Sequence, residues 1–159
     1  MGASVVGNRA DTGSRLIAAS PERLYAAHLN AASVAAWRPP TGMRAEIYRF
    51  DPRSGGGYRI AFVYDDDSIA GKSGDNADVF EATYLELVPN RRIVERVTFE
   101  SDDPAFAEPM TVTTTFTPEA GGTRVTSLCE NVSPAISEAD HQAGIASSLE
   151  NLARFAEAP

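Results

Sequence analysis

The feature that most constrains the fold is a succession of short segments whose apolar residues alternate with polar ones. In one of them Tyr58, Ile60, Phe62 and Tyr64 fall on the same face at a period of two. This alternation is typical of half-buried strands in an antiparallel sheet. The six strands predicted in this part of the chain are Ala45–Phe50, Tyr58–Tyr64, Val79–Val88, Ile93–Glu100, Met110–Thr117 and Arg124–Glu130.

The strands are followed by one long amphipathic helix. Ser137 is a good N-cap residue, and Asp140 three positions later resembles the acidic member of a capping box. Apolar or amphipathic residues then recur at spacings of four, four, three and four, which predicts a single stripe on one helix face. The stripe consists of His141, Ile145, Leu149, Leu152 and Ala156.

The N-terminal part predicts a strand and two short helices. Arg15–Ala19 is a short apolar run, and Ser20-Pro21-Glu22 carries the signals of a helix start. A second helical piece, Ser33–Trp37, ends before Pro39-Pro40, which cannot continue a helix. Residues 1–13 have no period and are predicted as a loose tail, with residues 14–159 forming one domain.

This order predicts an α+β fold. A sheet of roughly six antiparallel strands must cover one of its faces, and the C-terminal helix is the only element long enough to do so. We therefore expect a curved antiparallel sheet wrapped around the long C-terminal helix, with two short helices after the first strand.

Charge and cysteine content exclude several classes of function. The chain has 14 basic and 22 acidic residues, a net charge of −8, so nucleic acid and anionic membranes are poor partners. The single cysteine, Cys129, cannot form an internal disulfide, and the sequence predicts no metal site and no cofactor. No apolar stretch approaches a membrane span or a secretory signal, which favours the cytoplasm.

Five short segments carry a family resemblance. They are Ala19-Ser20-Pro21-Glu22-Arg23-Leu24-Tyr25, Ala36-Trp37-Arg38-Pro39-Pro40 with Gly42-Met43, Phe50-Asp51-Pro52-Arg53 leading into Gly55-Gly56-Gly57-Tyr58-Arg59, Glu86-Leu87-Val88-Pro89-Asn90-Arg91-Arg92-Ile93-Val94, and Gly122-Thr123-Arg124-Val125-Thr126. In this order they resemble the SRPBCC superfamily, also called the START or birch-pollen-allergen-like superfamily. Within it the chain is similar to homologues of the activator of heat-shock protein 90 ATPase, over about Arg15 to Phe155.

The resemblance implies a helix-grip fold with a cavity between sheet and C-terminal helix. The first expectation is therefore a protein that binds a small hydrophobic molecule in this cavity and is not an enzyme. One alternative is an enzyme similar to polyketide cyclases and dehydratases. Another is a stress-related, co-chaperone-like module that binds a chaperone. The namesake co-chaperone resembles this chain only through its second domain. A monomer and a homodimer are both compatible with the sequence.

The residues expected to contact the ligand lie on one face of the strands and on the helices above it. Plain core packing is the alternative for each of them. They are Trp37, Tyr58, Phe62, Phe80, Tyr84, Val97, Phe99, Met110, Val112, Thr114, Cys129, His141, Ile145 and Leu149.

No residue is assigned a catalytic role, but two are candidates. Glu95 shares strand parity with Ile93 and Val97, so it either points inward or escapes to water at an edge or bulge. His141 lies on the helix stripe, where it is either a cavity residue or a boundary histidine. Cys129 is expected to be a buried apolar filler, because no histidine is predicted beside it to activate the thiol.

Overall fold

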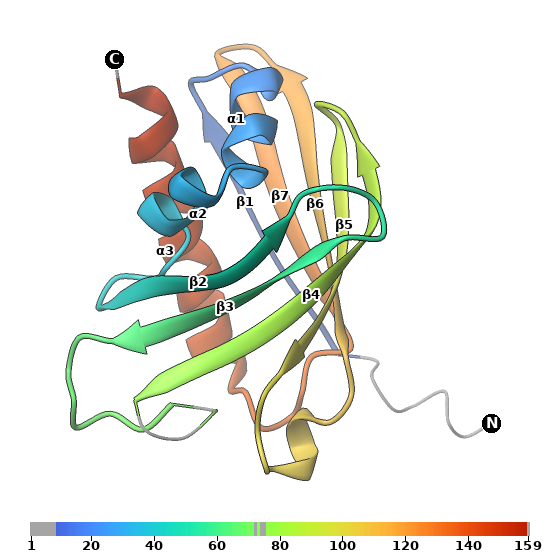
Figure 1. Cartoon of the computed structure of the whole chain (residues 1–159). Helices are drawn as coiled ribbons and strands as arrows, with labels where there is room; N and C mark the ends of the chain where they lie inside the picture. Colours follow the sequence, from blue (N-terminus) through green and yellow to red (C-terminus); the bar gives the residue numbers. More distant parts are fainter. Residues whose placement is uncertain (1–8, 72, 74–75, 159) are drawn as a thin grey trace.

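A seven-stranded antiparallel sheet wraps around the C-terminal helix in the computed structural model, which describes residues 9–71, 73 and 76–158 (Figure 1). The curved, unclosed sheet has the strand order β1-β7-β6-β5-β4-β3-β2. This confirms the predicted α+β helix-grip fold. The strands are β1 Ala10–Ile17, β2 Met43–Asp51, β3 Gly57–Tyr64, β4 Ala77–Val88, β5 Arg92–Phe99, β6 Met110–Glu119 and β7 Gly122–Glu130. The helices are α1 Pro21–His28, α2 Ala31–Trp37, η2 Pro104–Phe106 and α3 Glu138–Glu157.

The connections follow from the strand order. Each strand from β2 to β6 pairs antiparallel with the strand that follows it in the sequence, and β7 pairs antiparallel with β1, with Thr123 opposite Ile17. Because β1 and β2 lie at opposite edges of the sheet, the chain between them must cross the sheet. Helices α1 and α2 make this crossing beside α3, as Figure 1 shows.

Helix α3 begins as its sequence predicts. The Ser137 hydroxyl accepts a hydrogen bond from the Asp140 amide at 3.0 Å, so one of the free N–H groups at the helix start is satisfied. The predicted stripe is buried from Ile145 onward, since Leu149, Leu152 and Ala156 are also buried. The stripe therefore faces the sheet.

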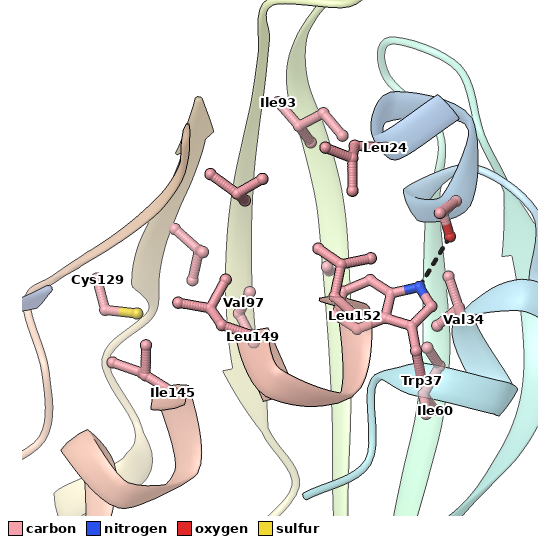
Figure 2. Packing of buried hydrophobic residues seen from close by; sticks show 14 of the residues in the cluster. Leu24, Val34, Trp37, Ile60, Ile93, Val97, Cys129, Ile145, Leu149 and Leu152 are labelled. Carbon is pink, nitrogen blue, oxygen red and sulfur yellow. Dashed lines mark hydrogen bonds between the residues drawn. The ribbon is translucent and has the colours of Figure 1, made fainter. Parts of the chain in front are cut away.

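The two short helices close one end of the core. Ser20 caps α1 and Asn30 caps α2 through their side-chain oxygens. The indole N–H of Trp37 donates to the Ala27 carbonyl at 3.0 Å, which joins the end of α2 to α1 (Figure 2). The Trp37 ring belongs to the same buried cluster as Leu152 and the other core residues, so its polar atom is satisfied without leaving the core.

Two sequence predictions about the ends of strands are wrong. Strand β1 begins at Ala10 and not at Arg15, so the loose tail predicted for residues 1–13 is wrong for residues 10–13. The backbone ladder to β7 fixes these residues although their side chains have no alternating pattern. Residues 1–8 lie outside the described residues. Strand β4 begins at Ala77 and not at Val79, so Asp78 belongs to the strand and is buried there.

Gly57 offers a test of this packing. A Cβ added there would overlap the backbone carbonyl oxygen of Ala82 on the neighbouring strand, and backbone atoms cannot move aside cheaply. We expect Gly57→Ala to lower the free energy of unfolding by about 1–3 kcal/mol in urea denaturation. The control is Gly144→Ala in α3, where a Cβ meets nothing within 4 Å. The control should be neutral or stabilising by up to about 1 kcal/mol, and equal destabilisation by both variants would contradict the close approach.

Candidate functional site

Helix α3 leaves part of the concave face of the sheet uncovered. A cavity of about 800 Å³ lies between the sheet, α2 and α3. Figure 2 shows the apolar side chains that pack around this region, with Ile145 and Leu149 of α3 directed toward Cys129 and Val97 of the sheet. The volume is within the range of small-molecule sites in proteins.

Twelve of the fourteen residues expected at the ligand line this cavity. They come from α2, from the sheet and from α3, so segments distant in sequence meet at one place. Their role toward a ligand stays a prediction. They are Trp37, Phe62, Phe80, Val97, Phe99, Met110, Val112, Thr114, Cys129, His141, Ile145 and Leu149.

Tyr58 and Tyr84 are the two exceptions. Both are buried, but neither reaches the cavity. Their rings pack edge to face with centroids 5.7 Å apart. They lie in the layer of buried side chains beside the cavity, and their contact with a ligand stays a prediction.

A buried charged cluster borders the cavity. The Tyr58 hydroxyl donates to the Glu95 carboxylate and accepts a hydrogen bond from the Arg38 guanidinium at 2.9 Å. Arg38 also lies 3.7 Å from the same Glu95 oxygen. Glu95 is 4% exposed, so the interpretation that it escapes to water is wrong. Its burial is possible because a cation and a hydroxyl compensate its charge.

The position of Arg38 is fixed by hydrogen bonds from α3 to the backbone of residues 38 and 39. The Ser148 hydroxyl donates to the Arg38 carbonyl and the Asn151 amide donates to the Pro39 carbonyl, both at 2.9 Å. These bonds satisfy carbonyls that follow the end of α2 and that the two prolines leave without helical partners. The segment after α2 is thereby fixed against α3, and the guanidinium lines the cavity.

Within this cluster the Arg38 guanidinium is charged and the Tyr58 hydroxyl is neutral. Burial alone would lower the pKa of Arg38, but the oxygens of Tyr58 and Glu95 outweigh it and the pKa is raised above its ordinary value. Burial raises the pKa of Tyr58 well above its ordinary value, so its hydroxyl keeps the proton that it donates to Glu95. Sequence analysis did not identify Arg38, because a single arginine after a helix carries no periodic signal.

A second polar group lies where α3 begins. His141 Nδ1 lies 2.6 Å from an Asp11 carboxylate oxygen, and Arg9 donates to both Asp11 oxygens at 3.3 and 2.8 Å. The hydrogen bonds from Arg9 hold the pKa of the Asp11 carboxyl below its ordinary value. Asp11 was not predicted, because residues 1–13 had been assigned to a tail.

Cys129 and His28 are two further titratable residues in the lining of the cavity. Burial raises the pKa of the Cys129 thiol to about 11, so it is protonated at neutral pH and behaves as the predicted apolar filler. Burial lowers the pKa of His28 to about 4, and its Nδ1–H donates to the Leu24 carbonyl at 2.8 Å. His28 packs edge to face on Trp37 and Phe116.

The described part of the chain contains neither a metal-binding group nor a membrane-spanning helix. Residues 9–71, 73 and 76–158 contain no group of three or more His, Cys, Asp or Glu side chains arranged to hold a metal ion. Among the same residues, no helix has both the length and the apolar character needed to cross a bilayer.

Comparisons with known proteins identify a family. A family model described as Activator of Hsp90 ATPase homolog 1-like protein matches residues 18–157. A solved structure from Chromobacterium violaceum is 30% identical with a TM-score of 0.83, covering 94% of this chain and 98% of that one. One from Rhizobium loti is 28% identical with a TM-score of 0.68, covering 92% and 96%. An AHSA1-like protein from Aeromonas hydrophila has 19% identity and a TM-score of 0.70, covering 94% and 92%.

No match was found among the curated proteins. The chain belongs to the Activator of Hsp90 ATPase homolog 1-like family, since the family model covers nearly its whole length. This confirms the resemblance seen in the sequence and is consistent with the SRPBCC superfamily, whose fold is in general a ligand-binding one.

The Arg38–Glu95 pair makes a testable contribution to stability. Arg38→Met leaves the Glu95 carboxylate buried without its cation, so we expect the free energy of unfolding to fall by about 3 kcal/mol. The double variant Arg38→Met/Glu95→Gln should recover part of this loss. The control is Arg49→Met, whose partner Glu81 lies 3.5 Å away with both side chains about half exposed. Its cost should stay below about 1 kcal/mol; equal costs for the two arginines would count against a buried pair.

His28 makes stability depend on pH. Its folded pKa of about 4 lies below the ordinary value of about 6.5, so the unfolded chain binds a proton there first as the pH falls. The free energy of unfolding should therefore decrease between about pH 6.5 and pH 4, by up to about 3 kcal/mol from this residue. Urea denaturation at several pH values measures it. His28→Phe should flatten this decrease and Tyr25→Phe, on the same helix, should keep it. An unchanged slope in His28→Phe would contradict the assignment.

Proposed function

We propose that this member of the family binds a small hydrophobic molecule in the cavity between the sheet and α3. The observation that supports this most is a cavity of about 800 Å³ that is lined by more apolar than polar residues, among them several phenylalanines. Apolar lining with a small number of placed polar groups is the usual composition of small-molecule sites.

Binding would be driven by removal of apolar ligand surface from water. Phe62, Phe80 and Phe99 line the sheet side of the cavity, and Ile145 and Leu149 line the helix side. Each Å² of apolar surface buried there contributes about 25 cal/mol. The affinity of such a site thus depends mainly on how much apolar surface the ligand offers.

The polar groups would orient the ligand. Arg38 and Glu95 compensate each other, so the cavity presents an N–H donor and a carboxylate acceptor without an uncompensated charge at that place. This favours an uncharged ligand with one polar group over an ionised one, because an ion would compete with an existing pair. His141 offers a second polar contact.

An enzyme similar to polyketide cyclases and dehydratases is the second candidate function. It is favoured by the presence of two titratable groups, Glu95 and His141, in the lining of one cavity. A stress-related, co-chaperone-like role stays a prediction from the resemblance alone. The cytoplasmic location and the monomeric or homodimeric state also stay predictions.

Titration with the uncharged fluorescent dye Nile red tests the proposal. We expect saturable one-to-one binding with a blue shift of the dye emission. Val97→Trp places an indole in the cavity, because Val97 lines it, and should weaken binding by about tenfold or more, the equivalent of 1.4 kcal/mol.

The matched control is Val94→Trp on the same strand. Val94 is partly exposed and does not line the cavity. Its affinity for Nile red should stay within about twofold of the wild type. Melting temperatures of both variants exclude unfolding as the cause. Equal weakening by the two variants, or binding that does not saturate, would show that the dye does not occupy the cavity.

A further inference from the structure

We propose that the cavity is a proton-transfer site in which His141, oriented by Asp11, acts as a general base on an uncharged apolar carbon acid. This rests on the proposed function, since the substrate must first occupy the cavity. In a protein that only binds its ligand, His141 would be a polar contact and nothing more. Proton transfer uses its ring nitrogen as a base.

The contacts of Asp11 determine the tautomer of His141. Asp11 is 1% exposed, and its carboxylate accepts hydrogen bonds from Arg9 at both oxygens. An ionised carboxylate can only accept, so the 2.6 Å bond between Asp11 and His141 has Nδ1 as its donor. A neutral His141 therefore carries its proton on Nδ1 and keeps the lone pair on Nε2, the form that a base requires.

The position of the pair explains what it can act on. Asp11 lies opposite Cys129 in the pairing of β1 with β7, and His141 lies in the first turn of α3, where it lines the cavity. When Nε2 takes up a proton, the Asp11 carboxylate stabilises the resulting imidazolium. Asp11 is thus a positioning residue and His141 the catalytic one.

The proposed step is an internally balanced isomerisation. Nε2 removes a proton from a carbon next to an electron-withdrawing group, the C–H bond breaks, and its electron pair stays on the ligand as an enolate-type anion. The imidazolium then returns the proton to another atom of that anion. No external oxidant, reductant or co-reactant is consumed.

Glu95, Cys129 and His28 also line the cavity, but each is engaged by another contact or holds its own proton. Glu95 already accepts a hydrogen bond from Tyr58 and is paired with Arg38. The Cys129 thiol is protonated at neutral pH, since burial raises its pKa to about 11. His28 has its pKa lowered by burial to about 4 and its Nδ1–H engaged by Leu24. His141 is the cavity imidazole that contacts a buried carboxylate, that of Asp11.

The base-promoted opening of 5-nitrobenzisoxazole tests the inference. In this reaction a base removes the C3 proton, the C–H electrons form a nitrile, and the N–O bond breaks to release a coloured phenolate. The probe is apolar and uncharged, so it matches the class of ligand proposed for the cavity. We expect saturable conversion faster than that by free imidazole at equal concentration.

The variants separate the roles of the residues. His141→Gln should lower kcat by about 100-fold, a usual contribution of general-base catalysis, with KM changed less than about twofold. Asp11→Asn should lower kcat and leave KM nearly unchanged, whereas a merely structural role would change both values together with the melting temperature. The control Glu150→Gln alters an exposed carboxylate on α3 and should keep the wild-type rate. Full activity in a folded His141→Gln, or loss in Glu95→Gln instead, would overturn the inference.

Binding and chemistry can fail separately. If 5-nitrobenzisoxazole displaces Nile red but is converted no faster than by imidazole, the inference is wrong and the proposed binding function stands. If neither compound binds, both are wrong.

A measurement on the wild-type protein avoids any folding defect of the variants. Nitrogen-15 NMR of the two histidine side chains at pH 8 should show His141 protonated on Nδ1 with a bare Nε2, and the Nε2 signal should shift when the probe binds. Protonation on Nε2 in the neutral ring would overturn the inference.

Discussion

The structure depends on one geometric constraint: a single helix must cover the concave face of a seven-stranded sheet. Seven strands spaced about 4.8 Å apart span roughly 30 Å, whereas a helix with its side chains is about 10 Å wide. Helices α1 and α2 cover one end, and Trp37 joins them to the core (Figure 2). The face that remains uncovered is apolar, and it borders the cavity.

The same constraint explains why charged groups lie inside. The segment after α2 must run from the short helices toward the sheet edge at β2, and α3 fixes it through hydrogen bonds to the carbonyls of Arg38 and Pro39. This brings the Arg38 guanidinium to the Glu95 carboxylate. At the other end of α3, Asp11 and His141 join the first strand to the helix. The segment that carries Arg38 and the strand that carries Asp11 are thus both bonded to α3.

The sequence allowed the position of a residue to be predicted where that residue belongs to a periodic strand or helix pattern. The strand face of Val97 and Val112 and the helix stripe of Ile145 and Leu149 repeat at regular spacings, so their place at the cavity could be predicted. The positions of Arg38 and Asp11 could not be predicted, because neither residue belongs to a repeating pattern of apolar and polar positions. Each is held by a partner more than 50 residues away in the chain, Glu95 for Arg38 and His141 for Asp11. The sequence left two interpretations for the direction of the Glu95 side chain. A buried carboxylate is strongly destabilising without a cation beside it, and the sequence did not show that Arg38 lies there.

The central claim is that an apolar ligand occupies the space under α3. Methyl-labelled NMR during addition of Nile red tests it most directly, because the methyl groups report the site of binding residue by residue. The account predicts that the signals of Val97, Val112, Ile145 and Leu149 shift together and saturate. Shifts confined to exposed side chains such as Leu16 and Leu85, with the cavity signals unchanged, would contradict it.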